Sequence, residues 1–153
     1  MTEIKYMNLI DLLYSNPDNV DNIKNQYLLL LSNLTTTDWI ETDLFVKNVE
    51  KISKVGSIIV GVINNYDIVA SGTIIIEPKI IRGGNSVGHI EDIVVINHMR
   101  GKGISHQILN KLKLLARENN CYKIILDCDN EVKNVYIKNG FEIKGVQMAQ
   151  YFV

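Results

Sequence analysis

The spacing of apolar and polar positions changes near residue 53 and divides the chain into two parts. Before that point, clusters of apolar residues alternate with Asn, Asp and Thr. Their spacing predicts an opening strand over residues 4–9 and two short amphipathic helices, over residues 27–31 and 39–49. Residues 36–38 (Thr, Thr, Asp) lie between these helices and are candidates for helix caps.

From residue 57 onward β-branched residues dominate, which favours strands. Three strands are predicted, over residues 57–63, 68–76 and 87–96. A hairpin turn at residues 64–67 joins the first two, and Pro78 ends the second before a glycine-containing loop at residues 83–85. The third run is nearly continuous in Ile and Val, which is typical of a strand that is covered on both faces.

The period then becomes that of a helix, with Ile104, Ile108, Leu112, Leu115 and Ala116 on one face. A short buried strand follows over residues 122–126, so strand, helix and strand form a right-handed parallel crossover. A helix over residues 131–138 and a last strand over residues 141–153 complete the chain. The fold class predicted is α/β, with a mixed central sheet whose antiparallel part comes first.

The length of 153 residues, 17.4 kDa, predicts one domain over residues 1–153. A hydrophobic fraction of 46% and a charged fraction of 22% are typical of a soluble globular chain. Sixteen basic and 17 acidic residues leave a net charge of -1, which gives no support for binding of nucleic acid or of an anionic membrane. The longest apolar runs, such as residues 58–63, are much shorter than a membrane span.

Two cysteines are too few for a disulfide framework, so a reducing, cytoplasmic setting is expected. Both cysteines, Cys121 and Cys128, are expected to be small buried apolar residues. The three histidines fit none of the standard zinc spacings, and no metal site is expected. His89 is expected to be structural.

The segment Arg100-Gly101-Lys102-Gly103-Ile104-Ser105 lies between a predicted buried strand and an amphipathic helix. Its glycines let the backbone approach a ligand, and the free amides of the helix start favour an anion such as phosphate or pyrophosphate. The Walker pattern is excluded because Ile104 follows Gly103, and the dinucleotide fingerprint would need glycine at His106. A tight turn carrying basic side chains is the alternative.

This segment resembles motif A of the GNAT superfamily of acetyl-CoA-dependent N-acetyltransferases, whose signature is Gln/Arg-x-x-Gly-x-Gly/Ala. Arg100 and Gly103 match, and Ser105 stands at the final small position. The resemblance implies the GNAT fold, with helices on both faces of the sheet, and acetyl-CoA as co-substrate. The loop would cradle the pyrophosphate and the preceding strand would hold the pantetheine arm. The implied CoA-binding residues are Asp92, Ile93, Val94, Val95, Arg100, Gly101, Lys102, Gly103, Ile104, Ser105 and Tyr136.

A more specific resemblance, to the glucosamine 6-phosphate N-acetyltransferases within that superfamily, covers most of the second half. It is carried by residues 74–77, 79–81, 88–93, 121–129 and 140–141. It implies transfer of the acetyl group to the amine of glucosamine 6-phosphate, by direct attack in a ternary complex, for UDP-N-acetylglucosamine synthesis. It also implies a homodimer built through the C-terminal strand.

The same resemblance assigns catalytic roles to Asp127, Tyr136 and Glu91. A carboxylate near the amine can accept its proton, and a phenol can donate to the departing sulfur. From the residues alone, Asp127 could instead cap a helix and Tyr136 could be a core residue. Glu91 and Asp92 interrupt an apolar strand, which favours a functional or paired role for them. Strand alternation would place these two on opposite faces.

The residues that the resemblance implies for the amino sugar phosphate are Lys79, Arg82, Glu91, Asp92, Tyr122 and Asp127. Lys79 and Arg82 would meet the phosphate, although exposed loop charges are common without any such role. The family carries an arginine after a C-terminal Val-x-Met that reaches the phosphate across the dimer. Here Val146-Gln147-Met148 is followed by no Arg or Lys. The missing contact would be worth about 1.5–3 kcal/mol.

Two alternatives therefore stay open. Either Arg82 takes over from the missing arginine, or the acceptor is another amino sugar or a sugar nucleotide. A non-catalytic acyl-CoA-binding module would keep the loop and lose the acid and the phenol. Because Asp127 and Tyr136 are both present, an enzyme is the preferred interpretation.

Overall fold

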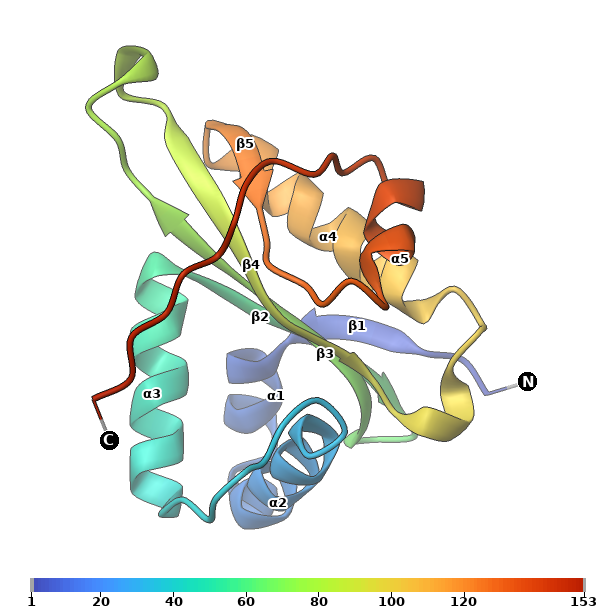
Figure 1. Ribbon diagram of the computed structural model, residues 1–153. Coiled ribbons are helices and arrows are strands. Elements are labelled where there is room, and N and C mark those ends of the chain that lie inside the picture. Colours follow the sequence, from blue (N-terminus) through green and yellow to red (C-terminus); the bar gives the residue numbers. More distant parts are fainter. Residues whose placement is uncertain (1, 153) are drawn as a thin grey trace.

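The computed structural model describes residues 2–152 and contains one five-stranded sheet (Figure 1). Its strands lie in chain order, so every neighbour in the sheet is also a neighbour in sequence. The first four strands are antiparallel, and the fifth runs parallel to the fourth. The strands are β1 (Lys5–Asn8), β2 (Gly56–Ile63), β3 (Asp67–Glu77), β4 (Ser86–Val95) and β5 (Cys121–Ile125).

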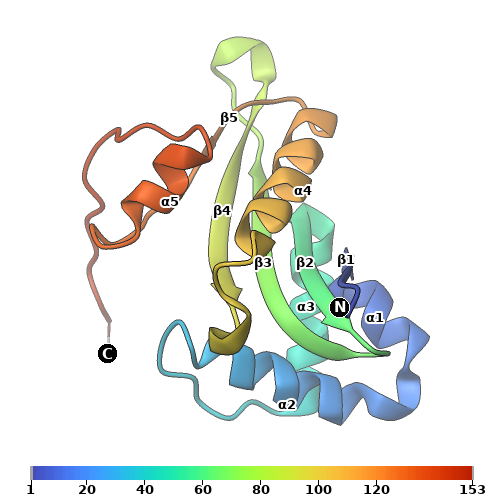
Figure 2. The ribbon, with the colours of Figure 1, turned by 90° about the vertical axis from the view of Figure 1, so that its right-hand side faces the viewer.

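Helices cover both faces of this sheet (Figures 1 and 2). One face carries α1 (Leu9–Ser15), α2 (Val20–Leu31) and α3 (Thr42–Val55), and the other carries α4 (Ile104–Glu118). The short helix α5 (Lys133–Lys138) is attached on the α4 side. Single turns of 3-10 helix occur at Pro17–Asn19, Arg82–Gly84 and Asn97–Met99. The mixed sheet, the two helical layers and the parallel β4–α4–β5 crossover confirm the predicted fold class.

Each face of the sheet has its own hydrophobic core, because alternate strand residues point to opposite sides. Val60 and Val62 of β2 pack with α1, α2 and α3, whereas Ile59 packs under α4. Ile104, Ile108, Leu112 and Ala116 form the buried stripe of α4, as their spacing predicts, and Leu115 borders it. α4 therefore lies rigidly on the sheet, with its N-terminus beyond the end of β4.

The helices of the first third were predicted poorly. α1 was missed, α2 begins seven residues before the predicted start, and α3 runs over Thr42–Val55 rather than residues 39–49. Residues 36–38 are not caps, since Glu41 occupies the N-cap of α3 without a side-chain hydrogen bond. Instead, the buried Lys24 ammonium donates to Ile40 O and Thr42 Oγ1, both at 3.0 Å. A contact from α2 thus fixes the start of α3, which local sequence does not reveal.

The predicted last strand is also wrong for the described part of residues 141–153. Residues 142–152, here called the tail, form no strand and no helix. Figure 2 shows the tail curving away after α5 and standing apart from the sheet. An extended segment becomes a strand only by pairing, and no strand of the described chain lies next to it. Val153 lies outside the described residues.

The burial expected for three further features is wrong. β5 is only half-buried, because it is the edge strand of the described sheet. Cys121 is half-buried and Cys128 is exposed, so Cys128 is not a core residue.

Among residues 2–152, no helix has both the length and the apolar character needed to span a membrane.

Candidate active site

A β-bulge in the middle of β4 marks the site. Thr73 of β3 pairs with Glu91 and Ser71 pairs with Val94, so Asp92 and Ile93 together oppose the single residue between Ser71 and Thr73. Asp92 has a left-handed backbone, with φ of 52°. Such a conformation is rare for a residue with a side chain and is concentrated at functional sites.

The bulge corrects the expectation that Glu91 and Asp92 face opposite sides. Ile90 and Ile93 both pack under α4, although regular alternation would put them on opposite faces. The inserted residue therefore breaks the alternation, and the two carboxylates are both exposed beside it. Bulges of this kind re-aim side chains next to active sites.

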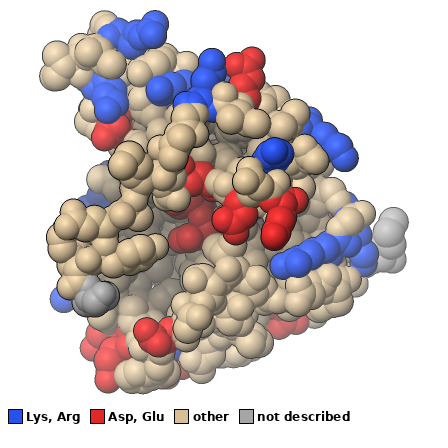
Figure 3. Space-filling view, in the orientation of Figure 1, with Lys and Arg blue, Asp and Glu red and all other residues tan. Residues whose placement is uncertain are grey.

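Three carboxylates are grouped here. The pKa of Glu91 is raised, chiefly by partial burial and then by the negative charges of Asp92 and Asp127. Asp127 follows β5, where the chain has already left the sheet. Figure 3 shows acidic side chains gathered at the centre of this face, around a hollow, with basic side chains above them. An acidic hollow of this kind suits a cationic group such as an ammonium.

The edge of β4 is free next to these carboxylates. β5 pairs with β4 only from Ser86 to His89, and no β5 residue pairs with residues 90–95. A strand edge without a neighbour presents backbone N–H and C=O groups that an extended ligand can bind. Among the predicted CoA-binding residues of this strand, Val94 is buried in the core under α2. Only its backbone can therefore serve a ligand.

The loop of residues 100–105 follows the free edge and begins α4. Gly101 and Gly103 have φ of 78° and 77°, and a Cβ at either position would meet no atom within 4 Å. Gly103 is the N-cap of α4 and supplies no side-chain cap, so the first amides of the helix stay available. Arg100 Nε donates to Val95 O at 3.2 Å, which ties the loop to the end of β4. Open glycines and free helix amides are the features that an anion cradle needs, and binding of an anion here stays a prediction.

Tyr136 on α5 completes the group. Its pKa is raised by burial and, to a smaller degree, by Cys128, so the phenol keeps its proton at neutral pH. The ring packs edge-on against Phe141, with centroids 5.9 Å apart, and borders the core under α4. The interpretation of Tyr136 as a core residue is thus confirmed in part, and its catalytic role stays a prediction.

The basic residues predicted for a phosphate lie around one tyrosine. The Arg82 guanidinium is 5.3 Å from the centroid of the Tyr122 ring, and Lys123 is 5.7 Å from it. Lys79 bonds Glu77 at 2.7 Å, and the Glu77 hydrogen bond is the main cause that raises the Lys79 pKa. Arg82 also has a left-handed backbone, with φ of 55°. Lys123 was missed by the sequence reasoning.

Comparison with known proteins decides the family. Residues 26–141 match the family model described as the acetyltransferase (GNAT) family. The chain belongs to this GNAT family.

Two curated relatives bear the same name. Glucosamine 6-phosphate N-acetyltransferase 1 of Dictyostelium discoideum is 37% identical over 139 residues, 88% of each chain. Probable glucosamine 6-phosphate N-acetyltransferase 2 of rice is 48% identical over 85 residues, 56% of this chain and 51% of that relative, so that match spans about half its length. The crystal structure of the enzyme of that name from Arabidopsis thaliana superposes with a TM-score of 0.86, at 30% identity and over 99% of both chains.

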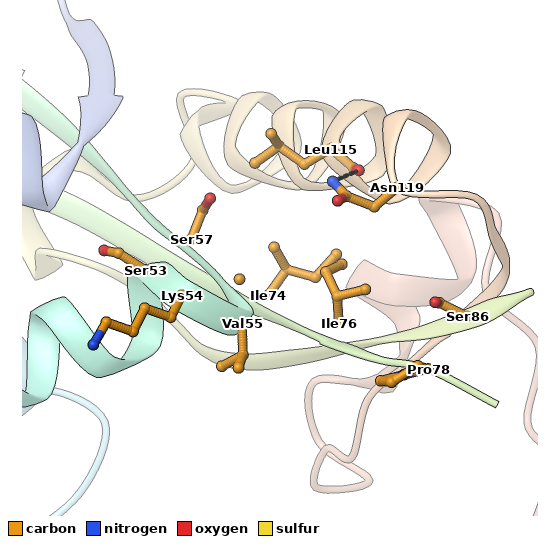
Figure 4. A pocket seen from close by; sticks show the side chains of 11 residues that line it. Ser53, Lys54, Val55, Ser57, Ile74, Ile76, Pro78, Ser86, Leu115 and Asn119 are labelled. Atoms are coloured by element: carbon orange, nitrogen blue, oxygen red, sulfur yellow. Dashed lines mark hydrogen bonds between the residues drawn. The ribbon is translucent and has the colours of Figure 1, made fainter.

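This GNAT chain also has cavities outside the site. A cavity of about 480 Å³ lies at Gly56 and Ser57, the first residues of β2, between the C-terminal ends of α3 and α4. Figure 4 shows Ile74, Ile76 and Leu115 lining it, with polar side chains at its margin. It is bounded by Ser86 at the start of β4 and is therefore separate from the bulge, six residues further on. None of the predicted site residues lines it.

Several residues that shape the site gave no signal in the sequence. Tyr27 of α2 accepts a hydrogen bond from Ser71 at 3.1 Å, in the core directly behind the bulge. The pKa of Tyr27 is raised mainly by burial, and the charge of Asp92 contributes to this increase. These positions are more than 40 residues apart along the chain, so only the fold brings them together.

Proposed function

We propose that this chain is a glucosamine 6-phosphate N-acetyltransferase that uses acetyl-CoA as its donor. The observation that carries the proposal is the carboxylate group of Glu91, Asp92 and Asp127 at the bulge. These carboxylates lie between the free edge of β4 and the C-terminal end of β5, and their negative charge would attract an ammonium group. The relatives of the same name support the choice of acceptor.

The donor fits the loop and the free strand edge. The pyrophosphate would accept hydrogen bonds from the first amides of α4, with Lys102 adding charge. Residues 92–95 would pair with the pantetheine amides along the edge that β5 leaves free. The open space at Gly101 and Gly103 lets the phosphates approach the backbone closely.

In the reaction, Asp127 accepts a proton from the substrate ammonium, and the neutral amine attacks the thioester carbonyl carbon. The carbon–nitrogen bond forms, the carbon–sulfur bond then breaks, and the second proton that the nitrogen loses goes to the departing sulfur, which leaves as the CoA thiol. No covalent intermediate forms on the protein. Tyr136 donates to the departing sulfur, and the raised pKa of its phenol keeps it in the donor form. Glu91 and Asp92 hold the amino sugar, so the rate depends largely on how the two substrates are held together.

The phosphate of the acceptor would bind where Lys79, Arg82 and Tyr122 meet. The Arg82 guanidinium lies over the Tyr122 ring, and a guanidinium held there can donate to a phosphate. Lys123 shares the same ring and adds a third cation. This group supplies the positive charge that the phosphate needs. The acceptor and the reaction belong to UDP-N-acetylglucosamine synthesis in the cytoplasm.

A homodimer completes the fold of this protein. Apolar side chains of the tail are almost fully exposed, at 90% for Val146, 91% for Met148 and 90% for Phe152. A second hollow of about 440 Å³, bordered by Ile75, Pro78 and Glu91, lies over β3 and β4. The tail of a second copy would bury its own apolar residues and part of this face at once.

The test is release of CoA thiol from acetyl-CoA with different acceptors. Glucosamine 6-phosphate should have a kcat/KM at least tenfold above that of glucosamine, because three cations surround the phosphate. Arg82→Ala should reduce this ratio, whereas Lys54→Ala, a cation outside the site, should leave it unchanged.

Other outcomes would replace the proposal. Equal rates with glucosamine or a UDP-linked amino sugar would keep the donor and discard the acceptor. Binding of acetyl-CoA with no thiol release for any of these acceptors would favour the non-catalytic binding module.

A further inference from the structure

The helix that carries Tyr136 is weakly attached by apolar contacts. α5 has six residues and none of them is fully buried. A helix this short is not stable by itself, so its position depends on the contacts that its end makes with the rest of the chain. Most of those contacts meet at one residue, Asn139, which follows the last residue of α5.

Asn139 bonds two side chains of α4 and its own helix. Its Oδ1 accepts from His106 Nδ1, and its backbone carbonyl accepts from the Lys113 ammonium. Its Nδ2 donates to Val135 O at 2.7 Å, and its N–H donates to Tyr136 O at 2.9 Å. One residue therefore connects the end of α5 with two turns of α4.

The partners on α4 form a stripe directed at α5. His106, Asn110 and Lys113 are spaced i, i+4 and i+7, which places them on one side of the helix. Asn110 Nδ2 contacts His106 Nε2 at 3.1 Å. Because Asn139 Oδ1 can only accept, His106 Nδ1 is the donor in the bond between them. Lys113 also lies 5.4 Å from the centroid of the Phe141 ring.

The clasp formed by Asn139, His106 and Lys113 connects the two ends of the donor site. His106 comes directly after the loop of residues 100–105, and Asn139 comes three residues after Tyr136. Displacement of α5 would move the phenol relative to the loop. We propose that the clasp is a positioning device that fixes Tyr136 against the thioester sulfur of a donor held by α4. The inference rests on the proposed function, because the sulfur is its point of action.

The variant Asn139→Ala tests the clasp, and Asn119→Ala is its matched control. Asn119 follows α4 as Asn139 follows α5, and its Nδ2 makes the same type of bond, to Leu115 O at 2.8 Å. Asn139→Ala should lower kcat by roughly tenfold to a hundredfold, as expected for a misplaced donor group. Its dissociation constant for CoA should not change. Asn119→Ala should leave both constants unchanged.

A double-variant cycle separates positioning from general loss of structure. In a Tyr136→Phe background, Asn139→Ala should lower kcat no further, because the hydroxyl that it positions is gone. Asn139→Asp, which keeps the acceptor for His106, should recover much of the rate. His106→Ala repeats the test from α4 if Asn139→Ala fails to fold.

An equal loss of kcat in both backgrounds would overturn the clasp and leave the proposed function intact. A wild-type chain that binds acetyl-CoA and releases no thiol would overturn the proposed function and the clasp together. Faster amide exchange over residues 133–141 in Asn139→Ala, with normal exchange in α4, would support the clasp independently of turnover.

Discussion

The ionised side chain of Glu91 lowers the stability of the folded protein because of its neighbours. Partial burial and two nearby carboxylates raise its pKa, so the folded protein favours the protonated form more than the unfolded chain does. Above that pKa the charged Glu91 therefore destabilises the fold. An ammonium bound at the site would relieve this repulsion, which gives the acidic group a reason to persist.

The variant Glu91→Gln should consequently raise the melting temperature slightly at pH 7 to 8. Below about pH 3, where glutamate is protonated in both states, the difference from wild type should vanish. Thermal unfolding followed across this pH range measures the effect. Glu3→Gln, an exposed carboxylate outside the site, is the control and should change little. A lower melting temperature for Glu91→Gln at neutral pH would contradict the argument.

At the scale of residues, the sequence singled out three carboxylates that the fold brings near one another, but not how they are arranged. Glu91 and Asp92 were selected because charges interrupt an apolar strand. Their alternation was predicted wrongly, because the bulge depends on how β4 pairs with β3. The residue opposite the bulge is Gly72, where a Cβ would lie 2.5 Å from Ile93 Cδ1 and 2.6 Å from Ile108 Cγ2. Such a close approach can be found only in the folded sheet.

At the scale of elements, α4 and its loop were predictable because their signals are local. The apolar stripe, the glycines and the basic residues all lie within about 20 consecutive positions. By contrast, α1 and α2 lie in a segment rich in Asn and Asp, which favour turns over helix interiors. Packing of Leu9, Leu12 and Ile23 against the sheet stabilises these helices despite that composition.

The loop before α4 provides a prediction that belongs to an element. Gly103→Ala should cost about 1–2 kcal/mol of stability, because the backbone there is left-handed. Its methyl group would enter the open space proposed for the pyrophosphate, so the KM for acetyl-CoA should rise roughly tenfold as well. Gly83→Ala has the same left-handed backbone and open surroundings, with φ of 69°. This control should lose similar stability with an unchanged KM for acetyl-CoA.

An unchanged KM for acetyl-CoA in both glycine variants would place the pyrophosphate elsewhere. Thermal unfolding and initial rates at varied acetyl-CoA concentration provide the two measurements. The comparison separates the strain of a left-handed residue from the space that a ligand needs.

At the scale of the whole molecule, the tail is the part that one chain does not explain. The sequence predicts a strand there from its apolar residues, and the single chain offers that strand no partner. In a monomer, Val146 and Met148 would remain exposed without any compensating contact, which soluble monomers rarely tolerate in a contiguous segment. The strand prediction and the single-chain structure agree if the partner strand belongs to a second copy.

The variant Met148→Glu distinguishes a monomer from a dimer. In a monomer the side chain of Met148 is 91% exposed, so a charge there should change neither the fold nor the mass in solution. In a dimer the same charge would be buried without a partner, which is strongly unfavourable, and the complex should dissociate. Sedimentation equilibrium of wild type should give twice the chain mass of 17.4 kDa, and that of Met148→Glu the chain mass itself. Lys144→Glu, which changes a charge on a polar position of the same tail, is the control and should remain dimeric. A wild-type protein that sediments as a monomer at micromolar concentration would leave the tail exposed and remove the dimer from the proposed function.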